Sequence, residues 1–191
     1  RRLGLVVSVV VIVVALTVSA VSLALATVTG FTDVPSSHPY STAIADLSSR
    51  NIIGGYGDGR FGPDDTVTRQ QFAKMIVLTG GYAVSEADGC PFIDVTNGGP
   101  TDLFPDNYVA VAAARNITTG VTATTFNPTG KITRYQVISM VVRAAYDLHP
   151  GLLSSPPPGW VATWGPHATH GANAARAQYN GLLSGLPLAA L

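Results

Sequence analysis

The chain has 191 residues, enough for one or two small domains; 47% of them are hydrophobic and only 12% are charged. Eleven basic and eleven acidic side chains give a formal net charge of +0, so a broadly basic nucleic-acid-binding protein is excluded. The single cysteine, Cys90, excludes a disulfide within the chain and is interpreted as a half-buried small side chain or as a thiol that pairs between two chains.

An uncharged apolar stretch opens the chain. Residues 5–26 carry no charge and follow two arginines, and the small-residue site Ala24-Leu25-Ala26 closes the stretch. This layout is typical of a secretory signal peptide, while about 20 apolar residues are also enough to span a bilayer. We therefore expect residues 1–30 to be either a cleaved signal or a retained anchor that contacts the membrane through residues 5–26. Both alternatives place the rest of the chain outside the cytoplasm.

The following part of the chain is duplicated. Residues 51–76 align without a gap on residues 116–141, at a distance of 65 residues, and 9 of the 26 aligned positions are identical. Such self-similarity is the signature of a repeat protein. A weaker third copy is seen at 179–186, and the chain is expected to end inside it. The predicted bounds are 31–86 for the first repeat, 87–149 for the second, and 150–191 for a Pro-rich connector with a partial third repeat.

Each repeat is predicted to be a helix, an irregular loop and a second helix. Apolar residues at helical spacing predict first helices at 39–50 and 106–115 and second helices at 68–79 and 133–147; a last helix is expected at 171–183. One unit has too few apolar residues for a core of its own. We therefore expect an all-α fold in which three units surround a shared core as a pseudo-threefold assembly, with grooves between them. The N-terminal hydrophobic helix is expected to precede this assembly.

Both second helices are predicted to begin with a capping box. Thr68 and Gln71 have the required spacing, and Thr133 and Gln136 repeat it. In this motif the threonine hydroxyl accepts from the backbone N–H three residues later, and the glutamine side chain returns to the N–H of the cap. These four side chains are therefore interpreted as structural.

An arginine occupies the first helical position in both copies, as Arg69 and Arg134. The positive end of the helix dipole disfavours a cation there by about 0.3–1 kcal/mol, so a compensating partner is expected. Two interpretations stay open. One is a structural role, either an ion pair, for which Asp64 or Asp65 is available only in the first copy, or a solvated arginine. The other is an external anion, held by the arginine and the N–H groups of the helix start.

The spaced elements of the repeat resemble the S-layer homology (SLH) domain. These elements are the FTDV start at 31–34, the loop GYGDGRFGP at 55–63 and the helix start TRQQ at 68–71; the second repeat keeps FIDV at 92–95 and TRYQ at 133–136. The resemblance implies an exported protein that attaches non-covalently to the cell surface or cell wall. Its implied partner is an anionic, often pyruvylated, secondary cell-wall polysaccharide. Neither enzymatic activity nor a cofactor or metal is expected.

The resemblance also implies which residues bind the glycan. The arginine of the Thr-Arg pair typically holds the acidic sugar in a groove between repeats, which makes Arg69 and Arg134 the main candidates. The second repeat departs from the pattern, because Val121-Thr-Ala-Thr stands where the first has Tyr56-Gly-Asp-Gly. The first groove is therefore the stronger candidate. The secondary candidates, as groove positions, are Asp33, Asp94, Gly55, Tyr56 and Gly120.

Other functions have weaker support in the sequence. His167 and His170 suggest a metal-dependent enzyme, but no adjacent Glu or Cys completes a site. A calcium loop around Asp58 lacks the regular ladder of acids, and the equivalent loop of the second repeat has no acid. The alternative function is an exported envelope module that binds proteins rather than glycan. Trp160 and Trp164 suit such a surface, or they pack onto the repeats as structural residues.

Overall fold

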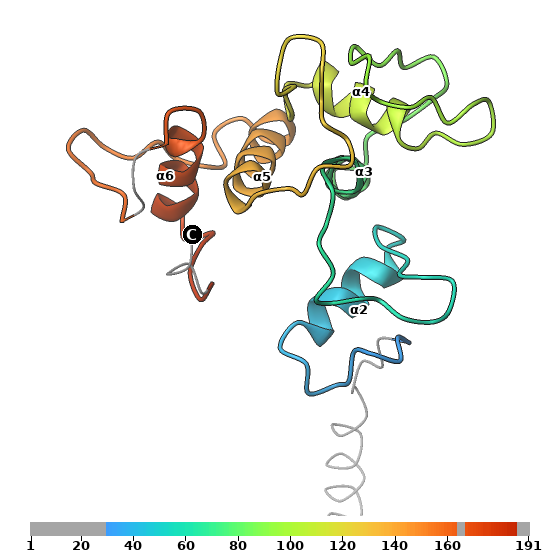
Figure 1. The fold of residues 1–191 in the computed structure, drawn as a ribbon. Helices are drawn as coiled ribbons and strands as arrows, with labels where there is room; N and C mark the ends of the chain where they lie inside the picture. The colour runs from blue at the N-terminus through green and yellow to red at the C-terminus, as the bar shows by residue number, and fades with distance from the viewer. Residues whose placement is uncertain (1–29, 164–166, 187–191) are drawn as a thin grey trace, which may run out of the picture. The chain divides into compact units, whose positions relative to one another are not determined.

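The computed structural model describes residues 30–163 and 167–186 (Figure 1). Within these ranges the secondary structure consists of five helices and no strand, which confirms the prediction of a helical chain. The predicted N-terminal hydrophobic helix lies outside the described residues, as does Trp164. Among the helices described, none is both long and apolar enough to cross a bilayer. The helices are α2 (Ser41–Ser49), α3 (Arg69–Thr79), α4 (Asp106–Ala114), α5 (Arg134–Leu148) and α6 (Gly171–Tyr179).

The three shorter helices recur at a fixed distance along the chain. α2, α4 and α6 begin at 41, 106 and 171 and end at 49, 114 and 179, so each lies 65 residues after the one before. α6 thus has the register of the first helix of a third unit. The predicted helix bounds agree with the structure to within two residues at every end except the last. That last helix ends at Tyr179, not at residue 183.

These three helices also end in the same way. The residue after each C-cap has a left-handed backbone, with φ of 55° at Asn51, 56° at Asn116 and 75° at Gly181. The next residue donates its N–H to the carbonyl five residues back, as Ile117 does to Ala112 at 2.9 Å. This is the Schellman motif, and Asn and Gly are the residues that tolerate its left-handed position. Gly181 therefore ends α6 earlier than the apolar pattern predicts.

Contacts within the chain divide it into two units, with the boundary between Asp64 and Asp65. In the first unit, α2 buries Ile44, and Val34 before the helix and Ile52 after it are buried as well. The second unit contains α3 together with α4, α5 and α6. Because α3 is the second helix of the first repeat, the sequence repeats and the structural units do not coincide.

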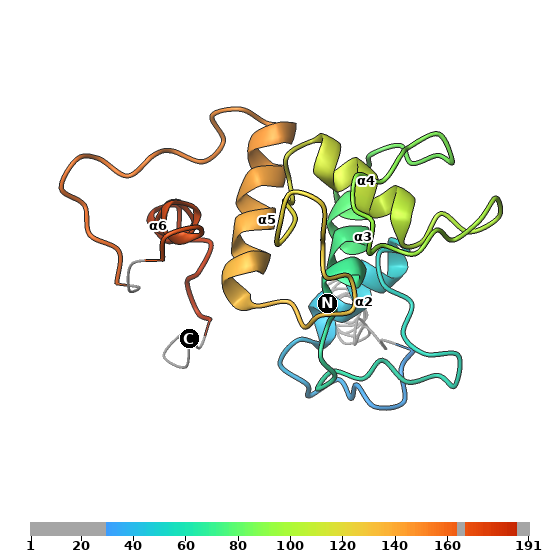
Figure 2. The same cartoon turned by 45° about the horizontal axis from the view of Figure 1, so that its top comes forward.

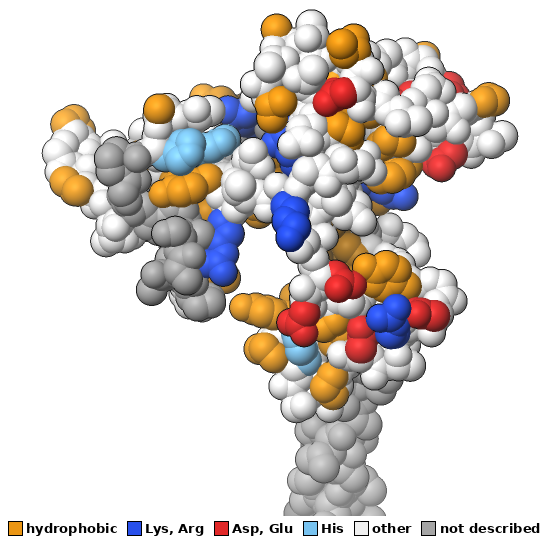
Figure 3. Space-filling view, in the orientation of Figure 1, with side chains coloured by type: hydrophobic (Ala, Val, Ile, Leu, Met, Phe, Trp, Pro, Cys, Tyr) orange, Lys and Arg blue, Asp and Glu red, His pale blue; other side chains and the backbone are white. Residues whose placement is uncertain are grey.

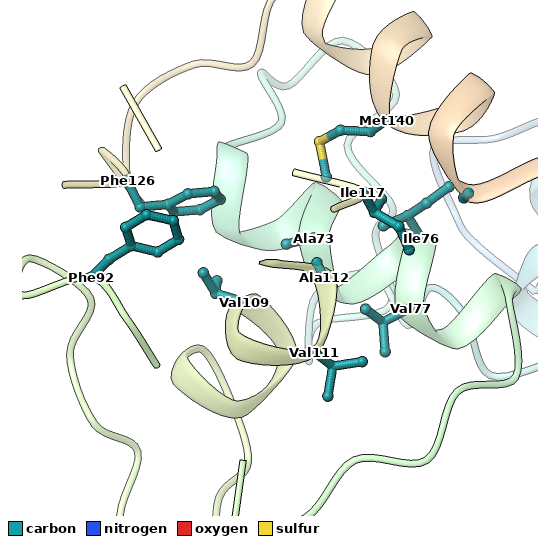
Figure 4. Close-up of a cluster of buried hydrophobic side chains, with 11 residues drawn as sticks. Ala73, Ile76, Val77, Phe92, Val109, Val111, Ala112, Ile117, Phe126 and Met140 are labelled. Atoms are coloured by element: carbon teal, nitrogen blue, oxygen red, sulfur yellow. The ribbon is translucent and has the colours of Figure 1, made fainter. Parts of the chain in front are cut away.

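The main core of the second unit lies between α3, α4 and α5. α3 packs against both other helices, and Figure 2 shows the three beside one another. Figure 4 shows the side chains of this core, where the Phe92 and Phe126 rings stack with their centroids 5.4 Å apart. Since α3 comes from the first repeat and α4 from the second, this core joins two repeats. Its buried members are Ala73, Ile76, Val77, Phe92, Val109, Val111, Ala112, Ile117, Phe126, Met140 and Ala144.

A smaller core joins α5 to α6, which pack against each other as α3 packs against α4. The second helix of one repeat thus holds the first helix of the next. The Pro-rich connector takes part in this core through Leu153, and its Trp160 ring lies edge-on to Tyr179 with centroids 5.6 Å apart. Trp160 therefore packs against the end of α6. The buried members of the smaller core are Ile138, Val142, Leu153, Ala177 and Leu183.

Candidate functional site

Both predicted capping boxes are present. The N–H of Thr68 donates to Oε1 of Gln71 at 2.8 Å, and the N–H of Gln71 donates to Oγ1 of Thr68 at 3.4 Å. Thr133 and Gln136 make the same two bonds at 3.0 and 3.3 Å. The glutamine side-chain oxygen accepts the N–H of the N-cap threonine, as the carboxylate of a glutamate would at this position. The structural role that the sequence gives these side chains is thus seen in both repeats.

The Arg69 side chain is buried in the second repeat. It is 5% exposed; its Nε donates to the carbonyl of Phe126 at 2.7 Å and its Nη2 to the carbonyl of Thr119 at 3.1 Å. The guanidinium also lies over the Phe126 ring, 4.4 Å from its centroid. Neither interpretation from the sequence foresaw these partners, which are backbone carbonyls and an aromatic ring of another repeat.

Backbone groups fasten the start of α3 to the same loop. The N–H of Arg69 donates to the carbonyl of Gly130 and the N–H of Gln70 to that of Pro128, both at 2.9 Å. Just before the helix, Thr68 and Lys131 form an isolated antiparallel bridge. A helix start leaves four N–H groups without partners in the helix, and the second repeat supplies partners for two of them. An anion at this helix start would therefore meet fewer available N–H groups than the sequence predicts.

Asp94 holds the same loop by its backbone N–H groups. Its Oδ1 accepts the N–H of Phe126 at 2.7 Å and its Oδ2 the N–H of Asn127 at 2.8 Å. In the first unit, Asp33 accepts the two equivalent N–H groups, both at 2.8 Å. The aspartate of each Phe-x-Asp-Val start thus closes the loop of its own repeat. The sequence signal for this contact is the Phe-x-Pro segment that recurs at the end of each loop.

Arg69 and Asp94 also influence one another through their charges. The hydrogen bond from the Phe126 N–H lowers the pKa of Asp94 more than desolvation raises it, and the Arg69 charge lowers it further. Burial lowers the pKa of Arg69, and the Asp94 carboxylate acts in the opposite direction. Guanidinium groups stay protonated in proteins. The buried Arg69 side chain is therefore a cation whose charge Asp94 partly balances.

The glycine and tyrosine candidates lie in the two loops. A Cβ atom on Gly55 would come within 2.6 Å of the Phe31 ring, and one on Gly120 within 2.7 Å of the Phe92 ring. Both glycines therefore allow a loop to pack closely on the phenylalanine that opens its repeat. Tyr56, in contrast, is 48% exposed, and the Arg60 guanidinium lies over its ring, with Cζ 5.4 Å from the centroid.

Arg134 differs from Arg69 in its exposure. It occupies the equivalent first position of α5, and its side chain is exposed. Beside it, the centroid of the Tyr135 ring lies 4.6 Å from that of His167 and 6.4 Å from that of His170. Across the described ranges, no three or more His, Cys, Asp or Glu side chains are placed to hold a metal ion.

Comparison with known families agrees with these repeated elements. The model of the S-layer homology domain matches residues 30–73 and 104–138. Each matched segment includes one Thr-Arg pair with its capping box. The two segments belong to the S-layer homology family.

Three relatives show in which proteins such segments occur. The chain is 31% identical to a cell surface protein of Thermoanaerobacter kivui over 134 residues, and this alignment covers 68% of the chain and 17% of that protein. It is 34% identical to a surface layer protein of Brevibacillus choshinensis over 101 residues, an alignment that covers 51% of this chain and 9% of that protein. It is 29% identical over 118 residues to a cellulosome-anchoring protein of Acetivibrio thermocellus, covering 60% and 25%. The chain thus spans a quarter or less of each relative.

Proposed function

We propose that this chain attaches to the cell surface by binding an anionic secondary cell-wall polysaccharide through its SLH repeats. The observation that carries the proposal is the match of two segments to the S-layer homology family, each with a capped helix that starts with Thr-Arg. Similarity to a surface layer protein and to a cellulosome-anchoring protein supports a role in attachment. On this proposal the chain is exported, has no enzymatic activity, and lies at the cell surface or in the wall.

Arg134 is proposed to contact the acidic sugar directly. Its side chain is exposed at the start of α5, where the positive end of the helix dipole favours an anion. A guanidinium binds a carboxylate through two parallel hydrogen bonds, which fixes the orientation of the sugar. The neighbouring rings of Tyr135 and His167 offer a partly polar surface for the rest of the ligand.

Arg69 is proposed to bind the ligand through its side chain, which is held by the loop of the second repeat. Its Nε and Nη2 donate to carbonyls, and its Nη1 makes no hydrogen bond to residues 30–163 or 167–186. That edge of the guanidinium is where an acidic group would bind. Thr119 directly precedes Gly120 and its carbonyl accepts from Arg69, so the Arg69 side chain contacts the loop that contains Gly120. The residues proposed to shape the loops are Asp33, Asp94, Gly55 and Gly120, and Tyr56 is proposed to contact the glycan through its exposed ring.

The pseudo-threefold assembly that the family resemblance implies is part of this proposal. The register of α6, which is that of a third first helix, supports it. A second candidate function is an envelope module that binds proteins and not glycan. The connector favours it, because Leu152 is 61% exposed and Val161 is 82% exposed.

Sedimentation with purified cell-wall sacculi tests the proposal. The full chain, in non-ionic detergent, is mixed with sacculi carrying a pyruvylated secondary polymer, before and after that polymer is extracted. We expect it to sediment only with untreated sacculi. Arg134→Gln is expected to weaken this binding, because it removes the exposed guanidinium. Arg50→Gln is the matched control, since Arg50 is an exposed arginine that pairs with Asp46 on α2.

Three results would count against parts of this proposal. Binding that survives extraction of the polymer would show that another wall component is the partner. Binding that Arg134→Gln leaves unchanged would remove the proposed contact. Retention only by sacculi that have kept their proteins would favour the protein-binding module.

A further inference from the structure

A groove of about 320 Å³ lies between α4, α5 and α6 in the second unit. Its volume is at the lower end of the range of small-molecule sites. None of the predicted glycan-binding residues lines it. Its charged and amide lining residues are Arg115, Asn116, Arg143, Asp147, Asn173 and Arg176.

The groove lies in the one basic part of the exported chain. Residues 30–129 have five basic and ten acidic side chains, 5 minus 10, or −5. Residues 130–191 have four basic and one acidic side chain, 4 minus 1, or +3. On the face shown in Figure 3, basic side chains (blue) lie around α5 and α6. The groove brings two of these four cations together with Arg115 of the preceding helix end.

The one acid of the groove already has partners. Oδ2 of Asp147 accepts from the Tyr82 hydroxyl at 2.7 Å and from Nη1 of Arg115 at 3.1 Å. Arg115 is further placed by the Tyr82 ring, whose centroid lies 4.2 Å from its Cζ. The charges of Asp147 and Arg115 therefore compensate one another.

Two arginines of the groove remain without an acidic partner in the described part of the chain. The side chain of Arg143 makes neither an ion pair nor a hydrogen bond with residues 30–163 or 167–186. Arg176 is held in place by the Ser155 hydroxyl, to which its Nη2 donates at 2.7 Å, and by the Tyr146 ring at 5.6 Å. Neither partner of Arg176 carries a negative charge. The groove thus presents two uncompensated guanidinium groups from two helices.

We propose that this groove binds an oxyanion, a carboxylate or a phosphate, carried on a sugar. Arg143 and Arg176 bind the oxyanion, because planar guanidinium groups match both anions geometrically. Asn116 and Asn173 line the same groove and supply amide groups for sugar hydroxyls. The inference rests on the proposed function in one respect: the oxyanion belongs to the same class of anionic wall polymer. It adds a subsite between the second repeat and α6.

Titration of the full chain in non-ionic detergent tests the groove by NMR of the arginine Nε–Hε groups. The probes are sodium glucuronate and glycerol phosphate, with glucose as the neutral control and sodium chloride at matched ionic strength. We expect both oxyanions to shift the Arg143 and Arg176 signals and glucose to leave them unchanged. The double variant Arg143→Gln, Arg176→Gln, followed at the Nε–Hε signal of Arg115 in the same groove, is expected to bind about tenfold or more weakly. Arg50→Gln is the matched control and keeps wild-type affinity.

The outcomes separate this inference from the proposed function. A stronger response to glucuronate identifies an acidic sugar, and a stronger response to glycerol phosphate a phosphate-bearing polymer; both support the groove. Equal shifts with sodium chloride, or a double variant that binds like the wild type while its circular dichroism is unchanged, would overturn it. Sacculus binding that persists in that case leaves the proposed function intact. Probe binding without sacculus binding refutes the proposed function and not the groove.

Discussion

Arg69 and Asp94 hold the same residue through its two backbone groups. The Nε of Arg69 donates to the carbonyl of Phe126 at 2.7 Å, and Oδ1 of Asp94 accepts the N–H of Phe126 at 2.7 Å. Arg69 belongs to the first repeat, whereas Asp94 and Phe126 belong to the second. A residue expected to bind an external ligand therefore also joins two repeats, and its loss is expected to affect stability as well as binding.

Arg69→Ala is expected to destabilise the second unit by about 2–3 kcal/mol, because the carbonyl of buried Phe126 and the carbonyl of Thr119 lose their donor. Arg134→Ala is the matched control at the equivalent helix position. Its side chain is exposed, so we expect a change of less than about 0.5 kcal/mol. Urea unfolding followed by circular dichroism measures both. Equal stability of the two variants would contradict the structural role of Arg69.

Asp94 is expected to make the stability of the second unit depend on acid. The Phe126 N–H lowers the pKa of Asp94 below its usual value of 3.8, so the ionised form is favoured in the folded state. The resulting stabilisation is complete above that value and is lost as the pH falls through the lower folded pKa. Asp94→Asn should therefore lower the melting temperature at neutral pH and reduce its fall on acidification. Thermal unfolding at a series of pH values measures this slope.

Asp46→Asn provides the control for that measurement, since it removes an exposed carboxylate that pairs with Arg50 on α2. Because Asp46 lies in the first unit, Asp46→Asn should leave the unfolding of the second unit unchanged. If Asp94→Asn retained the wild-type slope, the contact between Asp94 and the loop would have no role in acid stability.

Asn51 tests the repeated helix ending. Its φ of 55° lies in the left-handed region, which costs a residue with an ordinary side chain about 1 kcal/mol. Asn51→Ala is expected to destabilise the first unit by about that amount, whereas Asn51→Gly should be close to neutral. Thermal unfolding of both variants measures the difference. An alanine variant as stable as the glycine variant would show that the backbone is not held in this conformation.

Much of the local structure follows from the sequence because its causes are local. The capping boxes depend on residues three positions apart, as in Thr68 and Gln71, and both are present. Helix register follows from apolar spacing within a few turns. The helix endings were encoded as well, since Asn51 and Asn116 are identical positions of the two repeats. The 65-residue period then places α6 correctly, although the sequence similarity there is weak.

The environment of the candidate site depends on contacts between distant residues. Arg69 bonds to carbonyls that lie 50 and 57 positions further along the chain. The same pattern of residues around Arg134 gives an exposed side chain, so the motif alone does not determine burial. Arg143 and Arg176 approach each other only because α6 packs on α5. No periodicity or motif within one repeat contains this information.

Tyr82 is expected to ionise unusually late. Burial, assisted by its hydrogen bond to Asp147, raises its pKa to about 12 from a usual 10.0. Because the raised pKa belongs to the folded state, the stabilisation by neutral Tyr82 is complete below pH 10.0 and is lost as the pH rises towards about 12. Titration of the tyrosinate ultraviolet absorbance should show a late step that Tyr82→Phe removes. Asp147→Asn should move that step to lower pH, since it removes the negative charge beside the hydroxyl. If the late step persisted in Tyr82→Phe, it would belong to another tyrosine. That result would contradict the raised pKa of Tyr82 beside Asp147.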